Sequence, residues 1–542
     1  MPLVPLSALD RIDDDMSTIA PLSSASTYQP GAAVRSNAAG AAAPASAADT
    51  SSTTVALGGQ NNAANVALYS ASGLIGPNKQ PVWETRQPDA ISSLMAGAVG
   101  AKDLAGRLQG LGKALLDHVS EGGNGYAQSV LFSDLAMQGD AGVQGVLRDQ
   151  LKRFATDSVG LSVTTTGGAK INFSVSANSD GIAVNVDLEQ GSLTDADREA
   201  LRKLGDAFQT AINGLAQQPP KLALDGLMKF DASQLAAVDL KAKIGDDQTV
   251  QFHADAEQRS LSTSGAAGTM KVAVDLKNTA ILGSGDQRQR AISSYLEQFD
   301  AAARRGHGDA GLTDLFKDAF AQLNGNYPAQ GYVPGKPIPT VSADVNDRQM
   351  LSGLADFTAS ISQTTASPNP LNHSEIDGFD YQVSQTTSIT GQSQANRGIT
   401  QEQHSNLKAS YHESLQPGLP LKLGTDRQSQ NYTYHQIDDQ ASSKLEIGYD
   451  KGFLAKALLS QSASQNTRVT KYVMGEKVSD VSTPLQAAIV RDFAAQLNDG
   501  KDARAPDGAY RWRHKLDQIS AKSLLQPDPS ALRAQGKLAL LD

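Results

Sequence analysis

The chain has 542 residues, and its 57 acidic and 47 basic side chains give it a net charge of -10 at pH 7. Binding to nucleic acid or to an anionic membrane requires clustered Lys and Arg, so this balance argues against both kinds of partner. The absence of cysteine excludes disulfides, thiolate metal sites and a cysteine nucleophile. The sequence contains no run of about 18 apolar residues, so it predicts no membrane-spanning helix. Its N-terminus is acidic where a Sec signal peptide would be basic, so no such signal is predicted.

Residues 1-80 form a leader dominated by Ala, Ser, Thr, Gly and Pro. Such a composition buries too little apolar surface to offset the loss of chain entropy, so we expect this leader to be disordered. Bacterial type III secretion substrates carry similar uncleaved, Ser-rich leaders, but so do many cytosolic proteins. The leader is therefore compatible with export without establishing it.

Residues 90-155 show the apolar spacing of amphipathic helices. The two stripes are Leu104, Leu108, Leu111, Leu115 and Val143, Val146, Leu147, Leu151, Phe154. A glycine-rich break at residues 122–125 separates them. We expect a small helical region here.

Residues 156-324 predict an α+β domain. Apolar residues alternate with polar ones from Ile171 to Val175 and from Ile182 to Leu188, the period of strands with one buried face. Thr194, with Asp197 three residues later, has the pattern of a helix cap. Further alternation follows the helix. The short connections between strands predict mostly antiparallel pairing.

Residues 325-340 are rich in Pro and Gly and predict a linker, after which strand alternation resumes in residues 341-542. Thr483 followed by Pro484 predicts the start of a helix near the end of this part. The expected fold class is therefore α+β, with two mostly antiparallel β-sheet units, each accompanied by amphipathic helices, and a long disordered N-terminus. Strands followed by helices on both sides of the linker are compatible with a duplication, although no residue-level repeat supports one.

Two stretches resemble an uncharacterised family of α+β proteins from GC-rich Gram-negative bacteria, and the similarity covers about half the chain. The residues that carry it are Leu193, Leu204, Phe208, Lys229, Phe230, Asp231, Leu235 and Val238, with Ser410, Tyr411 and His412 among the later strands. The resemblance implies a bacterial α+β protein with no established activity. It carries over no catalytic residue.

Motifs for nucleotide binding, nucleophilic catalysis and zinc-dependent hydrolysis are absent from the sequence. His412 and His435 would face each other if their strands pair around a loop centred near Leu423 and Gly424. They are the only metal candidates, and because zinc needs three or four ligands, exposed sheet histidines are the simpler interpretation. Asp438 and Asp439 are adjacent, so strand pleating should point them to opposite faces. We therefore expect no catalytic residue, no cofactor and no metal.

These observations favour a non-enzymatic interaction protein of a Gram-negative bacterium. An unknown protein partner is expected, without nucleic acid. Secretion or location at the cell surface without a cleaved signal is slightly favoured over a cytoplasmic location. The alternative is a secreted effector or a cytosolic enzyme whose active site is assembled from residues distant in sequence.

Overall fold

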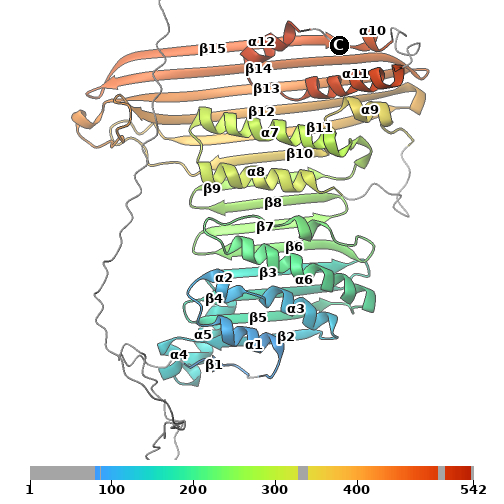
Figure 1. The fold of residues 1–542 in the computed structure, drawn as a ribbon. Coiled ribbons are helices and arrows are strands. Elements are labelled where there is room, and N and C mark those ends of the chain that lie inside the picture. The colour runs from blue at the N-terminus through green and yellow to red at the C-terminus, as the bar shows by residue number, and fades with distance from the viewer. Residues whose placement is uncertain (1–79, 86, 328–339, 499–506, 539–542) are drawn as a thin grey trace, which may run out of the picture. The chain divides into compact units, whose positions relative to one another are not determined.

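The computed structural model describes residues 80–85, 87–327, 340–498 and 507–538. Its strands form a single antiparallel sheet of 15 strands in the order β1-β2-β5-β4-β3-β6-β7-β8-β9-β10-β11-β12-β13-β14-β15 (Figure 1). The strands are β1 Val82–Trp83, β2 Gly125–Leu131, β3 Asp157–Thr165, β4 Lys170–Asn178, β5 Gly181–Gln190, β6 Leu235–Ile244, β7 Gln248–Asp255, β8 Gln258–Gly265, β9 Gly268–Asp275, β10 Asp356–Gln363, β11 Gly378–Gly391, β12 Arg397–Ser414, β13 Tyr432–Asp450, β14 Phe453–Val473 and β15 Glu476–Asp492. From β7 to β15, every strand pairs with the strand before it in the sequence, whereas β6 pairs with β3.

The helices of the described chain lie between these strands or after them. They are α1 Ala90–Ala98, α2 Leu104–Leu108, α3 Leu111–Ser120, α4 Asp134–Gln138, α5 Ala141–Arg153, α6 Asp195–Leu215, α7 Gly285–Gly306, α8 Ala310–Gly325, α9 Val345–Met350, α10 Ala494–Leu497, α11 Gly508–Ser523 and α12 Pro529–Gly536, with short 3-10 helices η1 Asp225–Met228, η2 Thr279–Ile281, η3 Gln394–Asn396 and η4 Arg427–Ser429. Within the described ranges, none of them combines the length and the apolar character that a membrane span requires.

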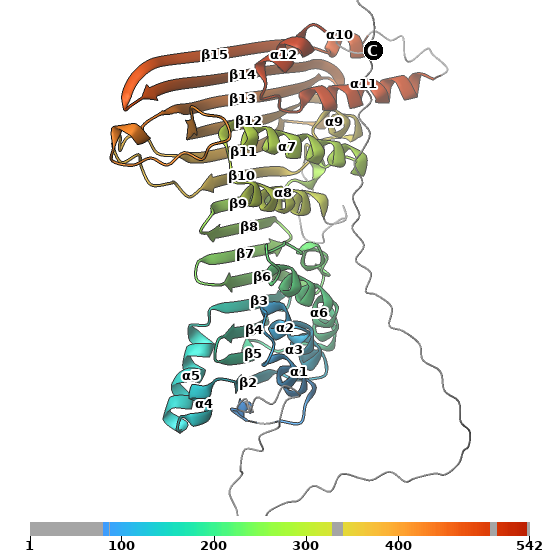
Figure 2. The same ribbon diagram turned by 60° about the vertical axis from the view of Figure 1, so that its left-hand side comes forward.

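The two faces of the sheet differ in what covers them. Helices α1 to α3, α6, α7 and α8 lie on one face, which we call the helix face, and α11 crosses the same face over the last strands (Figure 1). Only α4 and α5 lie on the other side, against β2 and β5 (Figure 2). In the described part of the chain, no helix covers the remaining strands on that side, which we call the open face.

The main hydrophobic core lies between the sheet and the helix face and is continuous along the chain. Its buried residues run from Ile91 in α1 to Leu532 in α12. Aromatic rings fill its middle, where Tyr295 and Phe320 both contact the ring of Phe357 edge to face at 5.1 and 5.0 Å. Such contacts stabilise a core beyond the apolar area that they bury.

The mixed α and β composition and the antiparallel pairing are confirmed, but the prediction of two sheet units is wrong. Strand β9 pairs with β10 over its whole length, with Val272 opposite Ala359, and this joins the strands on both sides of the predicted linker. A free edge exposes a row of unpaired backbone groups, and this pairing removes two such edges. The leader 1-80 lies outside the described residues except for Gln80, and so do residues 328–339 of the linker 325-340.

Of the two helix starts predicted from local capping patterns, one is confirmed and one is wrong. Thr194 and Asp197 form the predicted capping box of α6, since each side chain accepts a hydrogen bond from the other residue's backbone. The helix predicted from Thr483 is wrong, because Pro484 lies inside strand β15, opposite Asn466. Proline is tolerated there because β15 is an edge strand with one paired side. The sequence also gave no indication of β2, β8 or β14.

Candidate binding face

A trough of about 1030 Å³ lies on the open face over β10 to β15. Its floor is built from side chains that alternate with the core residues of each strand. One row of them crosses five strands as successive register partners: Gln382, Asn406, Gln440, Ser464 and Gln486. We call these residues the open amide row. Since neighbouring strands lie about 4.8 Å apart, the row is about 19 Å long.

A second row of uncharged side chains runs beside the open amide row, two residues away along each strand. It comprises Ser384, His404, Ser442 and Ser462, which are again register partners. The hydroxyl groups of Ser442 and Ser462 lie 2.8 Å apart. Lys271 and His404 are the ionisable side chains among the lining residues. The trough is therefore rich in hydrogen-bonding groups and poor in charge.

Charged residues bound this neutral strip on both sides. On one side, Lys408 lies between its register partners Asp380 and Asp438. On the other side, the Lys444 ammonium lies 3.1 Å from the Glu402 carboxylate. On β11 to β15 the charges of both signs lie in these flanking rows, and Lys271 of β9 lies at the far end of the trough, in register with Gln382 through Ser360. The neutral strip over β11 to β15 is therefore a delimited feature of the open face.

The helix face of the same strands carries a matching row, the buried amide row, formed by the register partners Gln385, Gln403, Ser443 and Gln461. These side chains are 1–3% exposed. They hold the last residue of α11 and the extended segment after it, where the Gln461 Nε2 donates to the Leu524 carbonyl at 3.0 Å. The Gln403 Nε2 and the Ser443 hydroxyl donate to the Ser523 carbonyl at 3.2 and 2.7 Å, and the Gln403 Oε1 accepts from the Leu525 N–H at 2.9 Å.

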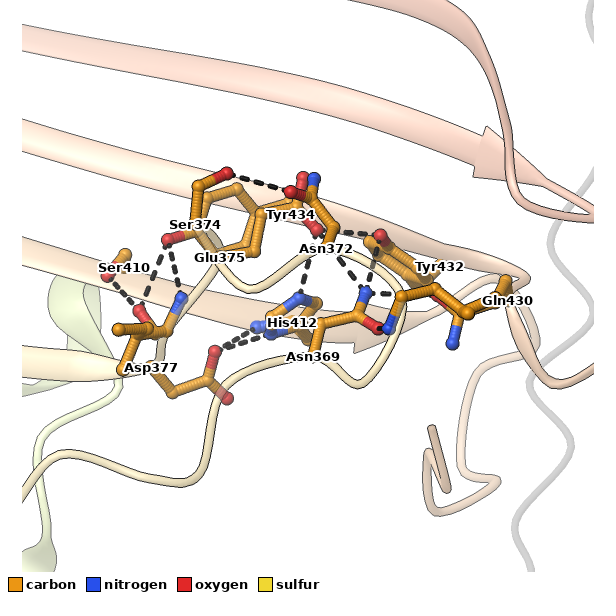
Figure 3. A network of polar contacts seen from close by, with 12 residues as sticks. Asn369, Asn372, Ser374, Glu375, Asp377, Ser410, His412, Gln430, Tyr432 and Tyr434 are labelled. Atoms are coloured by element: carbon orange, nitrogen blue, oxygen red, sulfur yellow. Dashed lines mark hydrogen bonds and ion pairs between the residues drawn. The ribbon is translucent and has the colours of Figure 1, made fainter. Parts of the chain in front are cut away.

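One end of the open face is covered by the loop between β10 and β11, which is fastened to β12 and β13 by a polar cluster (Figure 3). The His412 Nδ1 lies 2.6 Å from Asp377 Oδ1, and its Nε2 lies 3.3 Å from Glu375 Oε2. The Tyr432 hydroxyl donates to the same Glu375 oxygen at 2.6 Å. Asn369 donates to the Tyr432 oxygen at 2.8 Å. We call this set the His412 cluster.

The electrostatics of the His412 cluster favour a charged imidazole. Burial opposes that charge, but hydrogen bonds to Asp377 and Glu375 outweigh it and raise the pKa of His412 to about 9. Both ring nitrogens are engaged by carboxylates, so neither is available to take a proton from a bound substrate. The cluster therefore positions the loop.

His435 does not face His412, so that expectation is wrong. The strands pair His412 with Tyr434 and Tyr411 with His435, which places the two histidines on opposite faces. The His435 ring stacks on Tyr411 at 4.6 Å, and Tyr411 stacks on His307 at 3.7 Å. Burial lowers the pKa of His435. His412 is not an exposed sheet histidine either, because its side chain is 6% exposed.

The predicted separation of Asp438 and Asp439 is confirmed. Asp438 lies in the charged row of the open face, opposite Lys408. Asp439 points to the helix face, where the Arg305 Nη2 donates to its Oδ1 at 2.9 Å. The two carboxylates thus belong to different surroundings, and they cannot share one proton or one metal ion.

Sequence reasoning found the polar composition of these strands but missed both amide rows. Their only signal is amide and hydroxyl side chains at every second position, and this does not tell which face is buried. No group of three or more His, Asp or Glu side chains in the described ranges is placed to hold a metal ion. Comparison with protein-family models, with curated proteins and with solved structures gives no match.

Proposed function

We propose that this chain is a non-enzymatic interaction protein that binds an extended, uncharged polypeptide segment of a partner along the open amide row. The observation that carries the proposal is the buried amide row. There, Gln side chains of these same strands already hold the extended segment that follows α11, residues 524–525, by its backbone groups, and Gln403 and Ser443 also hold the carbonyl of Ser523, the last residue of α11. The open amide row presents the same kinds of group over a trough of about 1030 Å³.

The chemistry of the trough favours a polypeptide backbone over other ligands. Amide side chains both donate and accept hydrogen bonds, as backbone N–H and C=O groups require. A phosphate-rich ligand would need clustered cations, and a lipid would need an apolar lining. Asn406 adds a specific requirement, because its buried Oδ1 has no hydrogen-bond donor within the described chain. At about 3.3 Å per residue, a row about 19 Å long spans roughly six residues of an extended segment.

Peptide selection on the full-length chain tests this proposal. Peptides enriched from a random display library should be extended, poor in charge and rich in small polar residues. Their affinity, measured by fluorescence anisotropy, should fall about tenfold in Gln382→Lys, because a buried, unpaired ammonium would face an uncharged segment. The matched control is Gln251→Lys, which changes an exposed glutamine of the same register row on β7.

Two results would contradict the proposal. One is enrichment of peptides that bind both lysine variants as tightly as the unmodified chain. The other is a failure to enrich any peptide on the full-length chain while the immobilised protein keeps its folded circular dichroism spectrum.

We further propose that the protein acts outside the cytosol of a Gram-negative bacterium. The Ser-rich leader and the absence of cysteine support this location. Fractionation of a native culture under secretion-inducing conditions should recover intact protein outside the cytosol. Recovery from the cytosol alone would refute the location and leave the peptide-binding proposal untouched.

A further inference from the structure

A second, smaller cavity of about 230 Å³ lies on the helix face. One stripe of α7 forms its wall, including Glu297, Gln298 and Ala301. Core-facing side chains of β11 to β14 form its floor, and the segment between α11 and α12, residues 525–528, lies across it. Typical drug-sized pockets measure roughly 300–1,000 Å³, so this cavity suits a smaller molecule.

Gln298 lines this cavity and carries an unused acceptor. The residue is 9% exposed, and its Nε2 donates to the Leu525 carbonyl at 3.1 Å and to the Ser294 hydroxyl at 3.3 Å. Because a carbonyl oxygen can only accept, the contact with Leu525 fixes the orientation of the amide. The Oε1 is buried and accepts no hydrogen bond within the described chain. A buried acceptor of this kind requires a donor.

The charges around the cavity favour a cation. Three carboxylates line it, those of Glu297, Asp439 and Asp528, together with the Arg305 guanidinium. Arg305 pairs with Asp439, which is 7% exposed, so these two charges compensate each other. Glu297 and Asp528 then leave an excess of negative charge at the cavity. Asp528 also caps α12 by accepting from the Ser530 N–H at 2.7 Å.

Between these polar groups the lining is aliphatic. Ala301 and Ala302 face Leu407 and Leu525 across the cavity. A short hydrocarbon chain can be buried there, while an ammonium group supplies three hydrogen-bond donors.

We propose that this cavity binds a small aliphatic amine. Its ammonium donates to the Gln298 Oε1 and is neutralised by the Glu297 carboxylate, and its carbon chain lies against Ala302 and Leu525. A carboxylate ligand would meet the excess negative charge, and an uncharged diol would gain no ion pair. This site is separate from the open amide row, because it lies on the other face of the sheet.

Calorimetric titration of the full-length chain tests the amine site with three matched probes: 1,4-diaminobutane, 1,4-butanediol and succinate. We expect the diamine to bind with one site per chain, and the diol and the dicarboxylate to bind at least tenfold more weakly. Glu297→Gln should weaken diamine binding about tenfold, because it removes one carboxylate at an exposed position. Gln298→Met, which keeps the side-chain volume and removes the acceptor, should do the same.

Ala301→Leu is a further variant and, like Glu297→Gln, it replaces an exposed residue. Ala301 is exposed at the cavity, so a leucine there should obstruct the ligand without disturbing the core. Glu121→Gln, a change at an exposed residue after α3, is the control and should leave diamine binding unchanged. Three results would overturn the proposal. The three probes could bind equally, or the diamine could fail to bind. The third is diamine binding that neither Glu297→Gln nor Ala301→Leu changes.

Discussion

The two faces of β11 to β14 carry the same kinds of side chain in very different surroundings. On the helix face, Gln385 and Gln403 are 1% exposed and contact backbone groups of distant segments. On the open face, Gln382 and Gln440 are exposed over the trough. A glutamine in these strands is thus part of the core or of a surface according to what covers it. The helix face shows how such a row holds an extended chain.

The largest difference in the free energy of unfolding is expected between variants that break an ion pair on each of the two faces. Arg397 on the helix face is buried against Asp347, with side chains 4% and 0% exposed, whereas Arg468 and Asp480 on the open side are 50% and 25% exposed. Arg397→Met would leave the Asp347 carboxylate buried without its partner, so the free energy of unfolding should fall by about 3–5 kcal/mol. Arg468→Met should cost far less, because solvent screens an exposed ion pair. Urea denaturation of both variants measures the difference, and similar losses would contradict it.

The second contrast compares two glutamines. Gln403→Ala removes the acceptor of the Leu525 N–H and of the Tyr295 hydroxyl, which donates at 2.9 Å. Two buried donors would then be unpaired, so we expect a loss of about 3 kcal/mol in the free energy of unfolding. Gln382→Ala on the open face should change it by no more than about 0.5 kcal/mol. If the two variants were equally stable, the buried amide row would not be what holds the segment after α11.

The third contrast compares two histidines on the same face of β12. The folded pKa of His412, about 9, lies above its value of 6.5 in an unfolded chain. Its stabilisation is therefore complete below about pH 6.5 and is lost as the pH rises through about 9, on the order of 3 kcal/mol. His412→Gln should abolish this pH dependence, measured by denaturation between about pH 6 and pH 10.

His404→Gln is the matched control for that measurement. His404 is an exposed residue of the trough, where no loop covers it. This variant should keep the pH dependence of the unmodified chain and change its stability by no more than about 0.5 kcal/mol. A flat stability profile in the unmodified chain would show that the His412 cluster does not hold a charged imidazole.

The sequence predicted this fold best where short-range chemistry decides the structure. The capping box of α6 depends on two residues three positions apart, and the antiparallel pairing of β4 with β5 depends on the short connection between them. A one-residue shift in the pairing of β12 with β13 reverses the face of every side chain, and this is why His412 and His435 were expected to face each other. The segment that covers the buried amide row lies about 120 positions away from Gln403, beyond the reach of pattern analysis.

The order of the strands also bears on how the protein can be made. From β7 to β15, each new strand docks beside the strand that precedes it in the chain. A ribosome that delivers this sequence from its N-terminus would therefore add strands to a growing edge, without waiting for a later partner. Such stepwise growth keeps the entropic cost of loop closure low at most steps, and it limits the time for which an unpaired edge is exposed. Among the described residues, the contacts of α11 with α7, α9 and β13 and those of α12 with β14 and β15 form after the last strand has been made.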